Sequence, residues 1–285
     1  MADEPVASIK LYGRIFLTMD IVAVTGLRIG GKPTSLQIGG LENVVLRDPL
    51  SQRPYIPGSS LRGKMRSLWE KATNAPQNFY VRRGSPMVRI HTLDDKGILN
   101  NDVVCRIFGA TGDANPLGVK NPTRLIIHDT FLSDASALEL DEAGATDQPY
   151  TETKWEAAID RITSAAVPRQ MERVPAGARF TDCKLIYSVF GNRDKNPDQP
   201  PLDDIDWFFD IVTMLQLVED DYLGSSGSRG YGQIAFRNLR LGVRVTGEGD
   251  PIRYRDLRNT EVYPTLESFS AALDTLKPDV AQLFR

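Results

Sequence analysis

The chain has 285 residues, of which 41% are hydrophobic and 25% charged, and its formal net charge is −3. This composition is typical of a globular protein, and no apolar run approaches the roughly 20 residues of a membrane span. The first residues carry neither the basic nor the apolar region of a secretory signal, and two cysteines are too few for a disulfide framework. We therefore expect a cytoplasmic protein without a membrane partner.

Charge is unevenly distributed along the chain. Eight basic residues and one acid lie between 53 and 89, whereas nine acids and one lysine lie between 129 and 160. Such polarity favours a protein that binds a polyanion with one face, although ordinary surface patchiness is the alternative.

The hydrophobic pattern predicts alternating strands and helices. Apolar residues at every second position predict a long half-buried strand over 9–21. Further strands are expected at 44–46, 124–132, 180–190 and 233–245, and helices at 61–73, 203–222 and 265–276. This order predicts an α+β fold with a ferredoxin-like (RRM-like) core sheet, helices on one face and large insertions.

A glycine-rich loop joins the helix expected at 203–222 to the last long strand. It reads Leu-Gly-Ser-Ser-Gly-Ser-Arg-Gly-Tyr-Gly over 223–232. Glycine allows close approach of the main chain, and N–H groups in such a loop can hold phosphate oxygens. The candidate RNA-binding residues here are Gly227, Ser228, Arg229 and Gly230. The loop lacks the Walker and dinucleotide spacings, and a plain turn between helix and strand is the alternative.

A second anion-binding candidate is the start of the helix expected at 61–73. Small residues precede it, and basic residues follow at helical spacing. Main-chain N–H groups and the helix dipole favour an anion at such a start. The candidates are Ser59, Ser60, Arg62, Lys64 and Arg66. Solvated surface charge is the alternative for the basic members.

These two elements together resemble the signature motifs of the RAMP superfamily of CRISPR proteins. The segment 38–49, Ile-Gly-Gly-Leu-Glu-Asn-Val-Val-Leu-Arg-Asp-Pro, is similar to the active-site loop of the backbone subunit of type III effectors. The segments 159–163 and 166–173 resemble the thumb hairpin of that family. The resemblance runs from about residue 8 to about residue 240 and is closest to the Csm-type member of the Cas-seven group.

The resemblance implies a repeated backbone subunit of an RNA-guided effector. Copies of the chain would assemble head to tail along one CRISPR guide RNA, with other type III effector subunits as further partners. Each thumb would interrupt the duplex of guide and target single-stranded RNA, with Val167, Pro168 and Arg169 at its tip. Glu42 would cleave the target with a divalent metal, Mg²⁺ or Mn²⁺. The further RNA-binding residues that the resemblance implies are Arg28, Arg161, Val167, Pro168 and Arg169.

The resemblance also implies the domain organisation. A single RAMP domain would span 1–285, with its core at about 8–73, 124–133 and 180–245. An insertion at about 74–123 would form a lid or helical region, and one at about 134–179 would form the thumb. Residues 246–285 would be a C-terminal extension.

Two departures from the family pattern leave alternatives open. Glu42 stands where the family usually has aspartate, and Arg28 stands where it often has histidine. A catalytically silent subunit that only binds RNA is therefore one alternative. A standalone RNA-processing enzyme is another, but such enzymes usually rely on histidine, tyrosine or lysine, and His91 and His128 lie in no motif. These two histidines are also too far apart in sequence to predict a zinc site.

Overall fold

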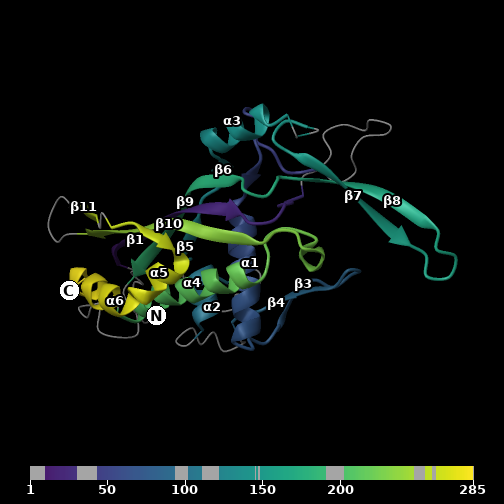
Figure 1. The fold of residues 1–285 in the computed structure, drawn as a ribbon. Coiled ribbons are helices and arrows are strands. Elements are labelled where there is room, and N and C mark those ends of the chain that lie inside the picture. The colour runs from purple at the N-terminus through teal and green to yellow at the C-terminus, as the bar shows by residue number, and fades with distance from the viewer. Residues whose placement is uncertain are drawn as a thin grey trace.

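The computed structural model describes residues 10–30, 44–93, 102–110, 122–144, 146, 148–190, 202–246, 254–258 and 261–284. It shows a mixed α/β fold whose core is an eight-stranded antiparallel sheet (Figure 1). The main path of the sheet is β11–β10–β1–β9–β6–β2, while β12 pairs with β10 and β5 with β9. Its strands are β1 (Leu11–Ala23), β2 (Tyr55–Ile56), β5 (Leu125–Ile127), β6 (Thr130–Leu132), β9 (Arg179–Phe190), β10 (Ile234–Thr246), β11 (Tyr254–Arg258) and β12 (Tyr263–Thr265). Of the predicted α+β fold, the mixture of helices and strands and the sheet-dominated core are thus confirmed.

Strand β1 lies between β9 and β10 and carries the predicted alternation. Every second side chain, such as those of Ile15 and Leu17, is buried, while its neighbours are partly exposed. Leu17 lies opposite Leu185 of β9 and Leu241 of β10. This period of two therefore builds one apolar layer across three adjacent strands.

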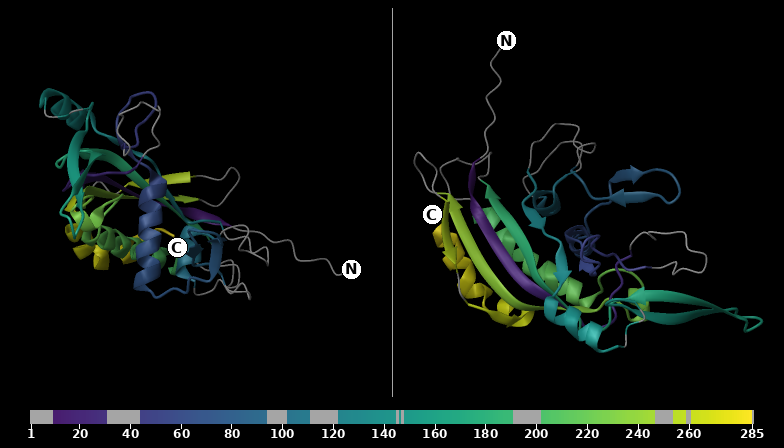
Figure 2. Two further views of the ribbon diagram at one scale, coloured as in Figure 1. Left: turned by 90° about the vertical axis from the view of Figure 1, so that its right-hand side faces the viewer. Right: turned by 90° about the horizontal axis from the view of Figure 1, so that it is seen from above.

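Helices cover the apolar face of the sheet. In the view from above, the sheet lies in front of α4 (Leu202–Asp220), α5 (Leu266–Ala271) and α6 (Leu273–Leu283) (Figure 2). Helix α1 (Gly58–Ala72) packs against α4. The buried side chains of α4 include Phe208, Val212 and Leu215, which join the core. No helix in the described part of the chain is long and apolar enough to cross a membrane.

Three elements differ from their predicted form. Residues 44–46 form a single bridge, between Gly30 and Val45, instead of a strand. The strand expected at 124–132 divides into β5 and β6, and the carboxylate of Asp129 between them accepts a hydrogen bond from the N–H of Gly58 at the start of α1. The helix expected at 265–276 is two helices, and the first is held by a capping box between Thr265 and Ser268.

Two hairpins project from the same side of the molecule, as the views of Figures 1 and 2 agree. One consists of β3 (Phe79–Arg82) and β4 (Val88–Ile90), and the other of β7 (Glu152–Ile159) and β8 (Ala166–Arg173). Each is a separate two-stranded sheet. Helix α2 (Val103–Phe108) follows the first hairpin, and α3 (Asp134–Glu142) precedes the second.

Candidate nucleic-acid interface

The glycine-rich loop 223–232 closes on itself and on the segment after β1. The N–H of Leu223 donates to the carbonyl of Gly232 at 2.8 Å, and the N–H of Gly232 donates to the carbonyl of Gly26 at 3.0 Å. A Cβ at Gly227 would collide with the ring of Tyr222, and one at Gly224 would collide with the carbonyl of Arg28. The glycines are therefore required by close packing, and they place the loop against residues 26–30.

Arg28 is held by this loop through both its side chain and its main chain. Its Nη1 donates to Ser225 Oγ at 2.8 Å, and the N–H of Ser225 donates to the Arg28 carbonyl at 2.9 Å. Burial lowers the pKa of Arg28, while the nearby carboxylates of Glu172 and Glu156 act in the opposite direction. Arg28 thus joins the predicted loop, although the two lie almost 200 residues apart in sequence.

Two of the predicted RNA-binding arginines meet at one carboxylate. Glu156 of β7 accepts a hydrogen bond from Arg169 Nη2 at 2.8 Å, and Arg229 Nη1 lies 3.4 Å from the same oxygen. Their side chains remain 42% and 52% exposed. Burial raises the pKa of Glu156, but Tyr231 and the two guanidiniums outweigh this effect and lower it. The glycine-rich loop and the β7–β8 hairpin therefore share an exposed cationic surface.

The buried side chain of Tyr231 lies next to Glu156, beside this surface. Lys154 Nζ lies 4.6 Å from the centre of its ring, and Arg173 Cζ lies 5.0 Å from it. Burial and the adjacent Glu156 carboxylate raise the pKa of Tyr231 to about 12, so its hydroxyl stays protonated at neutral pH. Sequence reasoning gave Tyr231 no role, because its partners come from β7 and β8.

The β7–β8 hairpin carries exposed apolar side chains on both strands and at its turn. Asp160 accepts hydrogen bonds from the N–H groups of Ile162 and Thr163, which close the turn and lower the pKa of Asp160. Ile162 is 93% exposed and Val167 is 68% exposed. The prediction placed Val167, Pro168 and Arg169 at the tip, but they lie within β8 beside the turn, and the turn itself contains Arg161, which is also exposed.

The start of α1 is partly occupied by the protein itself. The N–H of Gly58 donates to Asp129 Oδ1 at 2.8 Å, and the N–H of Ser60 donates to the Pro57 carbonyl. Ser59 is exposed. A Cβ at Gly58 would collide with the carbonyl of Ile127, so glycine is needed for the contact with β5. The carboxylate of Asp129 therefore already accepts one of the N–H groups of the predicted anion site.

The three basic residues of α1 that were predicted to bind RNA also have partners in the protein. Arg62 donates to the Phe108 carbonyl, and burial lowers its pKa. Lys64 pairs with Asp221 at 2.8 Å and lies over the ring of Tyr222, 3.7 Å from its centre. Arg66 has three partners: it pairs with Glu70 at 2.7 Å and donates to the carbonyls of His91 and Gly109. These contacts link α1 to α2, to the residue after β4 and to the residues just before the glycine-rich loop. RNA binding by the three residues stays a prediction.

The candidate catalytic residue Glu42 lies outside the described residues, but the segment that follows it is described. The N–H of Leu46 donates to the carbonyl of Ile29 at 2.9 Å, and the N–H of Val45 donates to Glu172 Oε2 at 2.6 Å. Glu172 lies on β8 and also accepts from Arg47 Nη2 at 2.6 Å. Residues 29–30 and 45–46, which flank the segment 31–43 in the sequence, are thus held together next to the glycine-rich loop and the base of the hairpin.

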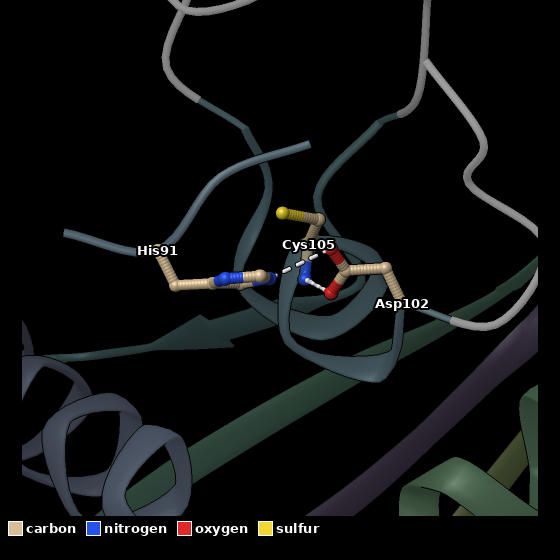
Figure 3. Close-up of side chains that lie close together, drawn as sticks. All are labelled: His91, Asp102 and Cys105. Carbon is tan, nitrogen blue, oxygen red and sulfur yellow. Dashed lines mark hydrogen bonds and ion pairs between the residues drawn. The ribbon is translucent and has the colours of Figure 1, made fainter. Parts of the chain in front are cut away.

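A cluster of possible metal ligands lies elsewhere, beside α2. Figure 3 shows the imidazole of His91 and the carboxylate of Asp102 facing each other, with the thiol of Cys105 beside them. His91 Nε2 lies 2.8 Å from Asp102, and its Nδ1 lies 2.8 Å from the Pro76 carbonyl. These hydrogen bonds raise the pKa of His91 to about 10, and burial raises the pKa of Cys105. A protonated imidazole and a protonated thiol bind metal ions poorly. In this protonation state the cluster therefore serves as a set of hydrogen bonds that joins His91 to the start of α2.

Sequence reasoning missed this cluster, because it paired His91 with His128 and not with its own neighbours. The available signal was the short spacing from His91 to Asp102 and Cys105 on the same insertion. The cluster also differs from the metal site expected at Glu42 in its ligand atoms. It offers nitrogen, oxygen and sulfur, whereas Mg²⁺ and Mn²⁺ prefer oxygen ligands.

Comparison with known proteins places the chain among CRISPR proteins. The profile of the RAMP superfamily matches residues 20–235. A Streptococcus thermophilus protein named CRISPR system Cms endoribonuclease Csm3 is 38% identical over 252 residues, which cover 88% of this chain and 99% of that protein. A Mycobacterium tuberculosis protein of the same name is 36% identical over 238 residues, which cover 82% of this chain and 91% of that protein.

Solved structures show the same fold. The crystal structure of Methanopyrus kandleri Csm3 aligns with a TM-score of 0.58 at 22% identity, over 95% of this chain and 98% of that one. A chain of the Csm3–Csm4 subcomplex from a type III-A interference complex aligns with a TM-score of 0.50 at 23% identity, over 93% and 97% of the two chains. At these identities the likeness concerns the fold alone.

Proposed function

Because the chain belongs to the RAMP superfamily, we propose that it is a repeated backbone subunit of a type III CRISPR effector in the cytoplasm. It binds guide RNA and the guide–target duplex, and it cleaves target RNA at regular intervals. The relatives named endoribonuclease cover most of this chain at 36–38% identity, which supports the same activity here. Its partners are the guide RNA, the target RNA, further copies of itself in a head-to-tail filament, and other effector subunits.

One structural observation carries the proposal: the shared surface of the glycine-rich loop and the β7–β8 hairpin. Arg169 of β8 and Arg229 of the loop are exposed there, and the hairpin also carries exposed apolar residues. Phosphate contacts from such arginines position a nucleic acid without reading its sequence, which base pairing with the guide supplies. Apolar side chains of a hairpin can replace base stacking where they enter a duplex.

The finer fold assignment belongs to this proposal. The strand order β10–β1–β9–β5, with α1 between β1 and β5 and α4 between β9 and β10, supports a ferredoxin-like core. The β7–β8 hairpin is then the thumb, and the insertion at about 74–123 is the lid or helical region. The domain limits predicted above accompany this assignment.

For the cleavage step we propose Glu42 as the catalytic carboxylate. The described chain resumes at Val44, and Glu172 of the hairpin accepts a hydrogen bond from the N–H of Val45, three residues after Glu42 in the sequence. A divalent ion, Mg²⁺ or Mn²⁺, would supply charge stabilisation at the reacting phosphate. The alternative remains a silent RNA-binding subunit, and the observation that favours it is glutamate in place of the usual aspartate.

The test is the assembled complex with matched target RNA, resolved on a sequencing gel. Fragments that differ by a constant number of nucleotides, and that disappear when EDTA removes the metal, are the expected result. Binding of target without any such fragments would establish the silent alternative. Failure to bind guide RNA would refute the assignment altogether.

A further inference from the structure

The hairpin of β3 and β4, residues 79–90, is strongly basic and is here named the β3–β4 arm. It contains three arginines and no acid, although the whole chain has a net charge of −3. Residues 80–89 are all exposed. Within the described part of the chain, the contacts of these guanidiniums are confined to the Tyr80 ring and the Met87 sulfur. The arginines are Arg82, Arg83 and Arg89.

The arm is fixed at its base and solvated along the rest of its length. Asn78 Nδ2 donates to the Thr92 carbonyl at 2.8 Å, and the N–H of Thr92 donates to Asn78 Oδ1 at 2.8 Å. Arg66 of α1 donates to the adjacent carbonyl of His91 at 2.6 Å. An isolated two-stranded hairpin is marginally stable in water, so these contacts fix the direction in which the arm projects.

Two of the three arginines of the arm lie against one aromatic ring. Arg89 Cζ lies 4.6 Å from the centre of the Tyr80 ring and Arg83 Cζ lies 5.5 Å from it. Stacking of this kind holds a guanidinium in place while its N–H donors remain available to a phosphate. Cations interleaved with an aromatic ring are typical of surfaces that bind single-stranded nucleic acid.

The arm lies on the side of the molecule that carries the cationic surface. It projects to the same side as β7 and β8 (Figures 1 and 2). It follows the C-terminal end of α1, a helix of 15 residues that spans about 22 Å. Lys64, in the first half of that helix, pairs with Asp221 just before the glycine-rich loop. A strand bound at the loop can therefore reach the arm along α1.

We propose that the β3–β4 arm is a second RNA-binding element, which contacts the phosphate backbone of the bound strand through Arg82, Arg83 and Arg89. The inference rests on the proposed function, because it requires that the chain binds RNA at the glycine-rich loop. It adds a contact that no predicted site residue supplies. Arginine is suited to it, since its planar fork binds phosphate oxygens in pairs.

The test measures binding of a fluorescent single-stranded RNA to the full chain by anisotropy over a range of salt concentrations. Replacing the three arginines with alanine (Arg82→Ala, Arg83→Ala, Arg89→Ala) should weaken binding at low salt. It should also reduce the slope of log affinity against log salt by roughly 2, since each contact with a single strand contributes about 0.7. Replacement of the same residues with lysine should restore the slope. Far-UV circular dichroism checks that each variant is folded.

Two controls separate the possible outcomes. Arg179→Ala, Lys184→Ala and Arg240→Ala remove the same charge from exposed positions on β9 and β10, and an equal loss in that variant would overturn the assignment to the arm. The second control, Arg229→Ala, tests the glycine-rich loop independently of the arm.

If Arg229→Ala weakens binding while the arm variant does not, the arm proposal is wrong and the proposed function stands. If neither variant changes binding, the proposed function is wrong as well. An arm variant that loses self-association but binds RNA normally would show that the arm contacts an acidic protein surface instead.

Discussion

The carboxylate of Glu172 accepts a hydrogen bond of 2.6 Å from the main-chain N–H of Val45. Glu172 lies on β8 at the base of the projecting hairpin, and Val45 lies three residues after Glu42. The side chain of Glu172 is 3% exposed, and it also accepts from Arg47 and Thr151. Residues 45–47 and the base of the hairpin are therefore one hydrogen-bonded unit.

Removal of the Glu172 carboxylate should destabilise the fold. Glu172→Ala leaves a buried N–H and a buried hydroxyl without their acceptor and removes the carboxylate that pairs with Arg47. We therefore expect the free energy of unfolding to fall by about 3 kcal/mol. Urea denaturation measures this loss. The matched control is Glu152→Ala on β7, whose carboxylate pairs with Arg173 but is 33% exposed. It should cost about 1 kcal/mol or less, and equal losses in the two variants would contradict the interpretation.

The sequence predicted the elements of the site better than their contacts. The glycine-rich loop was recognisable from its composition, but the reasons for its glycines were not. Gly227 packs on the Tyr222 ring, and Gly224 packs on the carbonyl of Arg28. The second contact joins residues 196 positions apart, and no local pattern encodes such a pair. The long strands were predictable because burial in a sheet has a period of two, which is a local property.

The partners of charged side chains were also beyond the sequence. Arg62 and Arg66 follow a helix start at the spacing expected of an anion site. In the structure they donate to the carbonyls of Phe108, His91 and Gly109. These carbonyls come from an insertion whose path depends on tertiary packing. Helical spacing shows which side chains share a face, but it does not show what that face meets.

Glu156 holds Arg169 and Arg229 in the absence of RNA, so it competes with phosphate for both. Glu156→Gln should therefore tighten RNA binding. We expect a change of about two- to fivefold, since an exposed ion pair contributes up to about 1 kcal/mol. Anisotropy titrations at fixed salt measure it. Glu139→Gln on α3 removes the same charge from an exposed position away from these arginines and is the control. Unchanged or weaker binding of the Glu156→Gln protein would be inconsistent with this competition.

The β7–β8 hairpin should interrupt the guide–target duplex at a regular interval set by the spacing of the subunits. Chemical probing of the bound duplex should show unpaired nucleotides at that interval, because apolar side chains of the hairpin replace stacked bases. Ile162→Ser together with Val167→Ser should reduce this reactivity. Both side chains are exposed, so the variant should fold normally. A continuous duplex in the native complex would show that the hairpin does not act as a wedge.

The last prediction concerns Glu42 and the cleavage of target RNA. Its carboxylate follows two glycines at 39 and 40 and lies one methylene further from the main chain than that of aspartate. Catalysis is sensitive to displacements on the order of 1 Å, so we expect slow, metal-dependent cleavage by the native chain. Glu42→Ala should abolish it without loss of assembly or guide binding, whereas Glu42→Asp should accelerate it. Single-turnover cleavage of labelled target by matched complexes measures all three rates. Cleavage that survives Glu42→Ala would place the catalytic group elsewhere, and no cleavage by either the native chain or the aspartate variant would leave the subunit a purely structural role.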